Sequence, residues 1–224
     1  VNPPPPSGAF VSIAVNADHA VALTASGTVR AWGSSTYNKS AIPAGLNNVI
    51  AIAAGPYHSL ALRANGTVVG WGRDPMNAYN QEVPPPTLTS VVAIAAGYTH
   101  SVVATADGTL VTWGDSGGTT PIGSGKVVAL CAGDHFSAAL TATGTVLAWG
   151  SNMFHQTDVP RGLSGVTAIA CGSSHTIALK SDGTVVGWGT NQYGQISIPS
   201  ELTNVIAIAT GDDYSLALRA DGSY

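Results

Sequence analysis

Short apolar segments alternate with glycine-containing turns along almost the whole chain. The apolar segments, such as Val91–Gly97 and Val205–Ala209, are five to seven residues long and rich in Val, Ile and Ala. Segments of this length and composition predict β-strands, because an amphipathic helix needs a longer stretch with a 3.6-residue period. None approaches the roughly 20 apolar residues that span a bilayer. The pattern therefore predicts many short strands joined by tight turns.

Five tryptophans mark a tandem repeat of about 39 residues. Each is followed by glycine, and successive tryptophans are 39, 42, 36 and 39 residues apart. A turn of a small or polar residue, Gly and Thr, such as Asp182-Gly183-Thr184, precedes each one. A large aromatic side chain at one recurring position favours packing between adjacent sheets over ligand stacking. These predicted structural anchors are Trp32, Trp71, Trp113, Trp149 and Trp188.

The fifth copy shows how one repeat divides into strands. Four strands are expected, A at Val166–Ala170, B at His175–Leu179, C at Thr184–Trp188 and D near Gln195–Ile198. Four antiparallel strands in a unit of this length form one blade of a β-propeller, and a blade buries its faces only when neighbours stack on it. The predicted fold class is therefore all-β, a β-propeller of four-stranded antiparallel blades with about five and a half repeats.

The repeat also sets the expected domain organisation. Residues 1–8 contain Pro3-Pro4-Pro5-Pro6 and are predicted to form a stiff proline-rich linker. A single propeller domain is expected over residues 9–224. The glycine-rich stretch Gly114–Gly125 is interpreted as a shortened connection between blades, in keeping with the 36-residue spacing. The expected repeats are 9–47, 48–89, 90–125, 126–164, 165–203 and a partial copy at 204–224.

The repeat resembles a known family. Ala170 to Gln195 reads A-x-G-x-x-H-[ST]-x-A-L-x-x-[DN]-G-T-V-x-x-W-G-x-N-x-x-x-Q, and the other copies match in part. This pattern resembles the regulator-of-chromosome-condensation repeat and extends from about Phe10 to the end. The resemblance implies a ring that usually has seven blades, so the ring here is expected to be incomplete, with self-association if it is left open.

Members of that family have contrasting roles. One is a chromatin-bound exchange factor for a small GTPase, and another is a secreted bacterial propeller that inhibits β-lactamases by capping them with one face. The segment from Trp188 to Pro199 looks closer to the bacterial propellers. The proline-rich start, the low charge and the high content of Ser, Thr and Gly favour an extracellular or cell-surface location as part of a larger exported protein, and the resemblance implies a bacterial one.

The charge of the chain and its lack of catalytic motifs argue against several classes of function. Only 9% of the residues are charged, against about 25% in an average soluble domain, and the net charge is −4. The eight basic residues form no stripe, so neither nucleic-acid binding nor attraction to a membrane surface is expected. No nucleophile elbow, HExxH or phosphate-binding loop is present, and we expect neither an enzyme nor a cofactor.

Recurring histidines and two cysteines raise the question of a metal site. His19, His58, His100 and His175 share one repeat position, with His135 shifted by one. Equivalent positions on separate blades lie too far apart to share one ion, so no metal site is expected and a structural role is favoured. Cys131 lies two residues before a repeat glycine and Cys171 one residue before. That offset points the two side chains to opposite strand faces, so we interpret both as core residues without a bond.

Variation between copies suggests a binding face. The A–B turns and C–D loops lie at one end of a blade and differ from copy to copy, whereas the B–C turns at the other end are nearly invariant. We therefore predict a protein-binding module. Alternatives are a carbohydrate-binding, lectin-like module and a structural segment of a larger extracellular protein. The predicted partner-binding residues are Tyr37, Tyr57, Arg73, Met76, Tyr79, Tyr98, Phe136, Asn152, Met153, Phe154, Asn191, Tyr193, Asp212 and Asp213.

Overall fold

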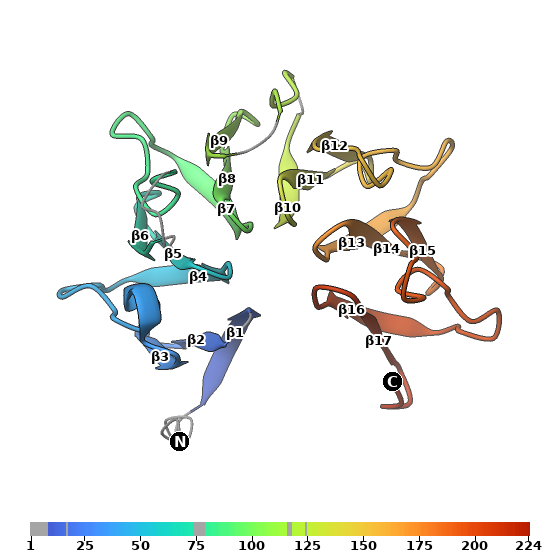
Figure 1. The fold of residues 1–224 in the computed structure, drawn as a ribbon, viewed down its shortest axis with the longest axis horizontal. Helices are drawn as coiled ribbons and strands as arrows, with labels where there is room; N and C mark the ends of the chain where they lie inside the picture. The colour runs from blue at the N-terminus through green and yellow to red at the C-terminus, as the bar shows by residue number, and fades with distance from the viewer. Residues whose placement is uncertain (1–8, 17, 74–78, 116–117, 124) are drawn as a thin grey trace. The chain divides into compact units, whose positions relative to one another are not determined.

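The computed structural model describes residues 9–16, 18–73, 79–115, 118–123 and 125–224, and it contains only short antiparallel sheets (Figure 1). Five sheets have three strands, one has two, and no sheet closes on itself in the described residues. One short 3₁₀ turn, η1 (Thr36–Asn38), follows β3. In chain order the strands are β1 (Phe10–Asn16), β2 (His19–Thr24), β3 (Val29–Gly33), β4 (Val49–Ala54), β5 (His58–Arg63), β6 (Val68–Gly72), β7 (Val91–Ala96), β8 (His100–Thr105), β9 (Leu110–Gly114), β10 (Val127–Ala132), β11 (Phe136–Thr141), β12 (Val146–Gly150), β13 (Val166–Cys171), β14 (His175–Lys180), β15 (Val185–Gly189), β16 (Val205–Thr210) and β17 (Ser215–Arg219).

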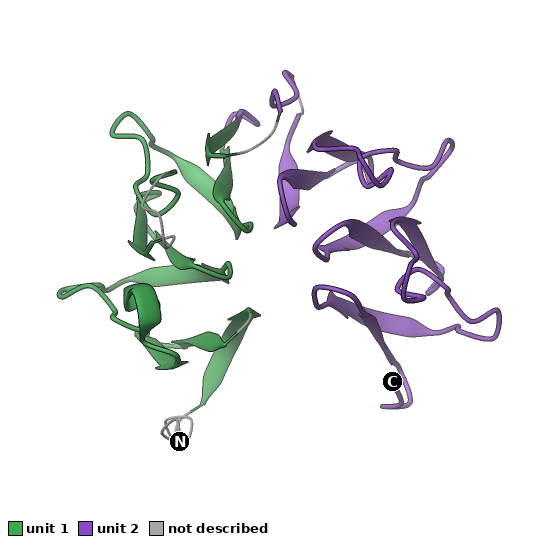
Figure 2. Cartoon of the chain, viewed as in Figure 1, with its two compact units in different colours: residues 1–106, 111–116 green, residues 107–110, 117–224 purple. Residues whose placement is uncertain are grey.

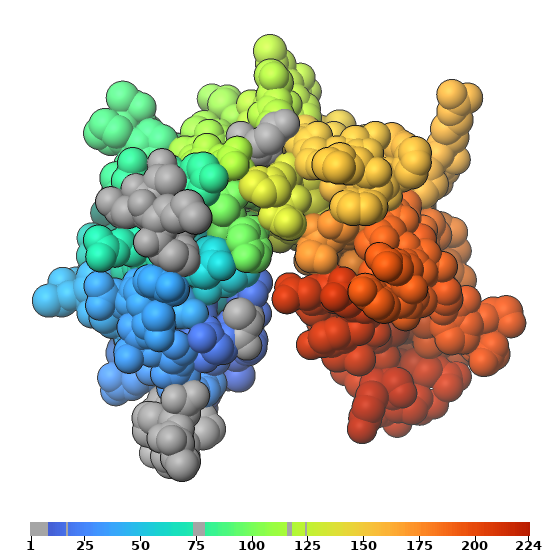
Figure 3. Space-filling model, viewed as in Figure 1, coloured from blue at the N-terminus to red at the C-terminus, as the bar shows by residue number. Residues whose placement is uncertain are grey.

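Contacts divide the chain into two compact units, which we describe separately (Figure 2). We number the sheets 1 to 6 by their first strands, β1, β4, β7, β10, β13 and β16. Unit 1 (residues 1–106 and 111–116) contains sheets 1 to 3 except Leu110, and unit 2 (residues 107–110 and 117–224) contains sheets 4 to 6. Within each unit consecutive sheets pack directly against one another (Figure 3). The predicted linker, residues 1–8, lies outside the described residues.

The B–C turns owe their shape to glycine. Gly66 and Gly183 have φ of 78° and 77°, a conformation that glycine adopts without steric cost. In the latter turn the Asp182 carboxylate accepts hydrogen bonds from the backbone N–H and the hydroxyl of Thr184, at 3.1 and 2.6 Å. This local bonding explains why a small or polar residue precedes each glycine and Thr or Ser follows it.

Trp71, Trp113 and Trp188 pack between consecutive sheets. In unit 1, Trp71 of sheet 2 is buried against Val21 and Val29 of sheet 1. In unit 2, Trp188 of sheet 5 is buried against Leu140 and Val146 of sheet 4. Each indole thus covers apolar surface on the preceding sheet, and it contributes to stability through that buried area.

The next sheet in the chain buries the leucines of a middle strand. Leu60 and Leu62 of β5 are fully buried, whereas their repeat equivalents in sheet 6, Leu216 and Leu218, are 50% and 40% exposed. Since the sequence around them is almost the same, the difference arises from what covers the strand: in the described residues sheet 6 has only two strands and no following sheet. Most of the apolar burial in this fold is therefore shared between neighbouring repeats.

The prediction of a fourth strand is not confirmed. The segment Gln195–Ile198 forms turns, and no sheet has a fourth strand in the described residues. Its backbone donors are used locally, because Ile196 N–H bonds the Asn191 side chain and Ser197 N–H bonds the Gly194 carbonyl. The segment still packs along β15, since a Cβ added at Gly187 would lie 2.9 Å from the Ile196 Cβ. It occupies the place of the outer strand without forming a ladder.

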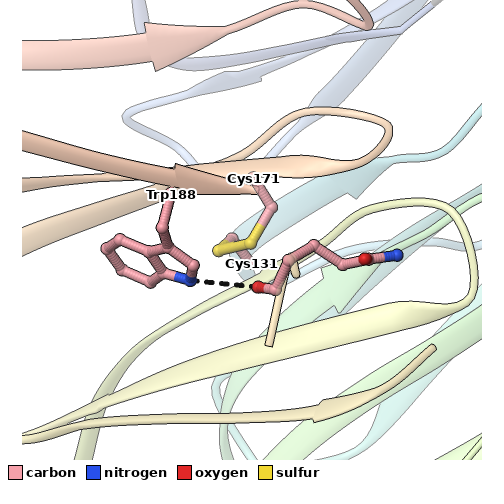
Figure 4. Close-up of a disulfide and its surroundings, with 4 residues drawn as sticks. Cys131, Cys171 and Trp188 are labelled. Carbon is pink, nitrogen blue, oxygen red and sulfur yellow. Dashed lines mark hydrogen bonds between the residues drawn. A yellow bond between two sulfur atoms is a disulfide. The ribbon is translucent and has the colours of Figure 1, made fainter. Parts of the chain in front are cut away.

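The prediction that the cysteines are unbonded is wrong. Cys131 of β10 and Cys171 of β13 form a disulfide between sheets 4 and 5, with Cα atoms 5.4 Å apart (Figure 4). The one-residue offset does turn the side chains to opposite faces of their own sheets. When two sheets stack, however, the upper face of one meets the lower face of the next. The offset is therefore the one that a bond between neighbouring sheets requires.

Candidate functional site

The A–B turns and C–D loops meet at one end of each sheet. The first residue after strand C donates its backbone N–H to a carbonyl in the A–B turn of the same sheet, as Ser34 does to Asp18 in unit 1 and Thr190 does to Ser174 in unit 2. The B–C turns lie at the other end, where Gly27 O accepts from Val49 N at the start of the following sheet. The loops that vary between copies are thus held together at one end of each sheet, and the nearly invariant B–C turns lie at the opposite end.

Four C–D loops present an aromatic side chain at the same repeat position. Each aromatic lies two residues before a buried polar residue, Lys39, Gln81, Gln156 or Gln195. All four rings are exposed, by 38 to 68%, which is unusual for large aromatic side chains. We call them the loop aromatics: Tyr37 and Tyr79 in unit 1, and Phe154 and Tyr193 in unit 2.

Buried glutamines shape the loops that carry these aromatics. The side-chain carbonyl of Gln156 accepts a hydrogen bond from Phe154 N–H at 2.8 Å, and Gln195 accepts from Tyr193 N–H at the same distance. The residue between the aromatic and the glutamine is in a left-handed conformation, with φ of 63° at His155. These contacts turn the chain so that the glutamine points inward and the aromatic outward.

The first loop has Lys39 in place of the glutamine. Its side chain is buried and forms an ion pair with Asp18 of the A–B turn. The hydrogen bond from Lys39 holds the pKa of Asp18 below its usual range. A charged pair therefore holds this loop in unit 1, where the glutamine amide holds the loops of unit 2.

Asn152 and Asn191 maintain the loop backbone. The side-chain oxygen of Asn152 accepts from Thr157 N–H at 3.0 Å, and that of Asn191 accepts from Ile196 N–H at 3.1 Å. Both residues are exposed at the surface. The sequence interpretation included them in the binding face, and the structure gives their side-chain oxygens an internal role there.

Three tyrosines of unit 1 form a continuous row. Tyr37 follows β3, Tyr57 lies in the turn between β4 and β5, and Tyr98 lies in the turn between β7 and β8. The ring centroids are 6.1 Å apart for Tyr37 and Tyr57 and 5.1 Å for Tyr57 and Tyr98, with edge-to-face angles of 79° and 82°. The hydroxyl groups of Tyr57 and Tyr98 are hydrogen-bonded at 2.9 Å. This tyrosine row extends across sheets 1, 2 and 3.

Phe136 does not belong to the exposed face. Its side chain is completely buried, because it occupies in β11 the position that His175 occupies in β14. A Cβ added at Gly133 would lie 2.1 Å from its ring, as one at Gly172 would from the His175 ring. The sequence interpretation was wrong here because His135, one residue earlier, was taken as the shifted repeat histidine.

Four of the remaining predicted face residues are exposed. Arg73 lies exposed after β6, and Met153 is exposed beside Phe154. Asp212 and Asp213 are exposed in the turn between β16 and β17. Met76 lies outside the described residues.

The repeat histidines and serines bond between sheets. In unit 1, His19 Nε2 contacts Ser59 Oγ at 2.9 Å and His58 Nε2 contacts Ser101 Oγ at 2.8 Å. In unit 2, His175 Nε2 contacts Ser215 Oγ at 3.0 Å. Each contact joins the second strands of two consecutive sheets.

A backbone carbonyl completes this network. Gln81 O accepts hydrogen bonds from Ser101 Oγ at 2.7 Å and from Trp113 Nε1 at 2.8 Å. The Ser101 hydroxyl donates its proton to that carbonyl, so its oxygen accepts a hydrogen bond from His58 Nε2–H. The neutral imidazole of His58 therefore carries its proton on Nε2. Trp71 and Trp188 donate to the equivalent carbonyls of Lys39 and Gln156.

The buried histidines are kept neutral. Burial, together with the neighbouring imidazoles of His100 and His19, lowers the pKa of His58 to about 3. Burial is also the main cause that lowers the pKa of His19 and of His175. These side chains are suited to fastening sheets rather than to exchanging protons near neutral pH.

The described residues contain neither a cluster of metal-binding side chains nor a helix that could span a membrane. Within the described ranges no three His, Cys, Asp or Glu side chains gather as a metal site would require. Among the described residues, no helix has the length and apolar character needed to cross a bilayer.

A family comparison identifies the repeat. The model of the regulator of chromosome condensation (RCC1) repeat matches residues 10–39, 49–81, 91–117, 127–156 and 166–195, about two thirds of the chain. The chain belongs to the RCC1 repeat family. Each match starts at strand A and ends at or near the C–D loop, so the matches follow the observed sheets.

Solved structures agree on the fold. The ectodomain of the receptor kinase CR4 from Physcomitrella patens is 24% identical, with a TM-score of 0.79 over 98% of this chain and 61% of its own. Prp20p from Saccharomyces cerevisiae is 20% identical, with a TM-score of 0.79 over 95% of this chain and 70% of its own, and human WBSCR16 is 19% identical, with a TM-score of 0.73 over 95% and 74%. This chain thus spans about three fifths of the moss ectodomain and has the all-β, propeller-like fold of RCC1 repeats. A search of curated protein sequences found no match.

Sequence reasoning missed three features of the site region. The final Gln of the motif was noted without a role, although Gln81 and Trp113, like Gln156 and Trp188, are separated by the same 32 residues. The recurring Ser or Thr after each histidine was the partner of the histidine in the preceding repeat. The two cysteines are 40 residues apart, about one repeat length, and this spacing also indicates a contact between neighbouring repeats.

Proposed function

We propose that this chain is a non-catalytic protein-binding module that docks its partner on the A–B turns and C–D loops. The observation that carries the proposal is the recurrence of an exposed aromatic at one position of four C–D loops. Exposed aromatic side chains on a rigid frame are typical of interface centres, since they bury much area with little loss of conformational entropy. In unit 1 these loops and turns also expose Arg73, and in unit 2 they also expose Asp212 and Asp213.

Related proteins support protein binding as the role. The structure of yeast Prp20p was described together with its binding to Gsp1p and histones, and yeast RCC1 (Prp20) was solved with Kap60 bound. Those partners belong to the yeast protein. What carries over to this chain is the use of RCC1 repeats as a frame for contacts with other proteins.

A carbohydrate is the second candidate. Tyr193 is 68% exposed, and a ring this free is able to stack on a sugar ring. A structural segment of a larger extracellular protein is the remaining alternative, and it requires no ligand at this face.

The disulfide supports an extracellular or cell-surface location. Disulfides persist in oxidising compartments and are rare in the reducing cytosol of most cells. The Cys131–Cys171 bond between sheets 4 and 5 suits a protein of the first kind. The similar structures reported above come from a moss, a yeast and human, so they lend no support to the expected bacterial source.

Photo-crosslinking tests the docking face directly. A crosslinking amino acid is placed at Tyr79 or Tyr193 on the proposed face, and at Asn65 or Asp182 in the B–C turns as a matched control. The crosslinked protein is identified, purified and titrated against the wild type, Phe154→Ala and Tyr193→Ala. We expect crosslinks only from the first pair and about tenfold weaker binding by the variants. Equal crosslinking from the B–C turns, or unchanged affinity, would overturn the proposal. Binding to a glycan array that both variants abolish would favour the lectin reading.

A further inference from the structure

The C–D loops of unit 2 expose large apolar side chains next to one another in the fold. Met153 and Phe154 are neighbours in the loop of sheet 4, and Tyr193 lies in the loop of sheet 5. The three side chains are 49 to 82% exposed. Apolar side chains that gather on a surface in this way mark interaction sites.

Backbone hydrogen bonds join the segments that surround these side chains. Asp134 N–H donates to Ser173 O at 2.8 Å, and Ser173 N–H donates to Asp212 O at 3.1 Å, so the A–B turns of sheets 4, 5 and 6 are linked in a row. Ser151 N–H donates to His135 O, which ties the C–D loop of sheet 4 to its own turn, as described above for sheet 5. We call this connected surface the unit 2 face: residues 133–135, 151–158, 172–174, 190–197 and 211–214.

The unit 2 face carries four carboxylates and no Lys or Arg, and the structure describes every residue of it. The acidic residues are Asp134, Asp158, Asp212 and Asp213. Asp158 accepts hydrogen bonds from His155 Nδ1 at 2.7 Å and from Asn152 Nδ2 at 2.8 Å. These bonds, that of His155 first, hold the pKa of Asp158 below its usual range, so this carboxylate stays ionised near neutral pH. The face is therefore acidic as well as apolar.

The basic residues in the described part of unit 2 all lie outside this face: Lys126, Arg161, Lys180 and Arg219. At the B–C turns, acids are balanced by a cation of the same hairpin. Lys180 Nζ lies 2.8 Å from the Asp182 carboxylate. Arg219 Nη1 lies 3.9 Å from the Asp221 carboxylate. The two ends of unit 2 thus differ in charge, since only the unit 2 face has acids without Lys or Arg beside them in its own segments.

This combination of groups selects the chemistry of the occupant. A guanidinium group pairs with carboxylates through parallel N–H donors and stacks on an aromatic ring. The aliphatic stems of Arg and Lys cover apolar surface while their charged ends stay in water. An acidic segment is repelled by the same carboxylates, and a neutral segment buries them without a partner.

We propose that the unit 2 face binds a segment of the partner protein that contains several Arg or Lys residues. The carboxylates pair with the cationic groups, and Phe154 and Tyr193 pack against the side chains that carry them. This proposal rests on the docking face described above and names the kind of segment that its unit 2 part receives.

A labelled decapeptide of alternating glycine and arginine tests the proposal by fluorescence anisotropy with the purified chain. A decapeptide of alternating glycine and glutamate is the matched control. We expect the arginine peptide to bind, with an affinity that falls as the salt concentration rises, and the glutamate peptide not to bind. Addition of spermine tests whether a small polycation displaces the peptide, and we expect none at equal total charge because spermine lacks groups that stack on the rings.

Paired variants separate this face from the overall charge of the chain. Asp212→Asn with Asp213→Asn should weaken binding of the arginine peptide about fivefold. Asp182→Asn with Asp221→Asn removes the same charge at the B–C turns and should leave binding unchanged. These turns tolerate the amide, because Asn65 fills the position in sheet 2 and accepts from Thr67 N–H at 3.1 Å.

The aromatic contribution has its own pair of variants. Tyr193→Ala should weaken binding of the arginine peptide about tenfold. Tyr79→Ala removes a loop aromatic of unit 1 and should leave binding unchanged. Thermal unfolding of each variant confirms that the fold is kept.

Several results would overturn the idea. These are no binding of the arginine peptide at millimolar concentration, equal loss from the two double variants, insensitivity to Tyr193→Ala, or displacement by spermine at equal charge. If crosslinking at Tyr193 identifies a partner while the arginine peptide fails to bind, only the choice of a basic segment is lost. If the peptide binds as expected and the crosslinks come equally from the B–C turns, the broader docking face is wrong and the unit 2 face stands alone.

Discussion

The disulfide between Cys131 and Cys171 joins sheets 4 and 5, where Phe136 stands in place of the histidine that elsewhere bonds a serine of the next sheet. At the junctions of sheets 1 and 2, 2 and 3, and 5 and 6, a histidine bonds a serine of the next sheet. Between sheets 4 and 5 the equivalent residues are Phe136 and Thr176, and the Thr176 hydroxyl is buried without a hydrogen-bond partner. A covalent bond thus joins two sheets that lack the usual polar fastening.

Removing the disulfide should destabilise unit 2. We expect Cys131→Ala with Cys171→Ala to lower the free energy of unfolding by about 2–4 kcal/mol, because the bond closes a long loop. Urea unfolding measures the loss, and hydrogen exchange of β13 against β4 of unit 1 locates it. Adding Phe136→His and Thr176→Ser should recover about 1 kcal/mol by restoring the hydrogen bond. Equal protection of β13 with and without the bond would contradict this role.

Acid should weaken the sheet junctions. The pKa values of His19, His58 and His175 are lowered in the folded chain. As the pH falls, these histidines are therefore protonated at a higher pH in the unfolded chain than in the folded chain. Stability from these groups is complete above about pH 6.5 and falls as the pH drops, by up to about 1.4 kcal/mol per unit for each histidine. For His58 the loss continues to about pH 3. Urea unfolding from pH 7 to 4 measures the slope, and His58→Phe, which copies Phe136, should reduce it. An unchanged slope in that variant would exclude His58 as a source.

Two hydroxyl deletions should have opposite outcomes. Ser101 Oγ links His58 to the Gln81 carbonyl, so Ser101→Ala leaves both without this partner and should cost about 1–3 kcal/mol. Thr176 occupies the equivalent position without a hydrogen bond, so Thr176→Val should be neutral or slightly stabilising. Thermal unfolding of the two variants compares them. A similar loss from both would show that the hydroxyl network does not fasten the sheets.

The same leucine substitution should differ between sheets. Leu62→Ala removes a fully buried side chain between sheets 2 and 3, and we expect a loss of about 2–5 kcal/mol. Leu218→Ala, at the equivalent position of sheet 6, removes a side chain that is 40% exposed and should cost about 1 kcal/mol. Chemical denaturation gives both values. Equal losses would mean that stacking of the next sheet contributes little.

Much of the fold could be predicted because five copies carry the same pattern. The Trp-Gly pairs, the Asp-Gly-Thr type of turn and the first apolar strand appear where the sequence places strands C, the B–C turns and strands A. The fourth strand was not predictable from the apolar segment near Ile196, because its backbone donors are taken by Asn191 and by local turns. Propensity does not reveal such competition.

The candidate site was harder to predict, since it depends on which side chains of neighbouring sheets meet. Phe136 was misplaced by one residue, and that single step separates an exposed turn from a buried strand position. The Cys131–Cys171 bond was missed because the faces of each strand were considered without the neighbouring sheet. The aromatic residues of the loops were recognisable as a group, whereas the edge-to-face row of Tyr37, Tyr57 and Tyr98 required coordinates.

The indole N–H groups of Trp71, Trp113 and Trp188 each donate a hydrogen bond to a main-chain oxygen. Every amino acid supplies this atom, which is why Lys39 serves in place of glutamine without loss of the indole bond. The side chains of the loops can therefore change without loss of the indole–carbonyl hydrogen bond that joins the sheets. New specificities can be installed by exchanging whole loops between repeats or between relatives, much as antibodies vary their hypervariable segments on an unchanged framework.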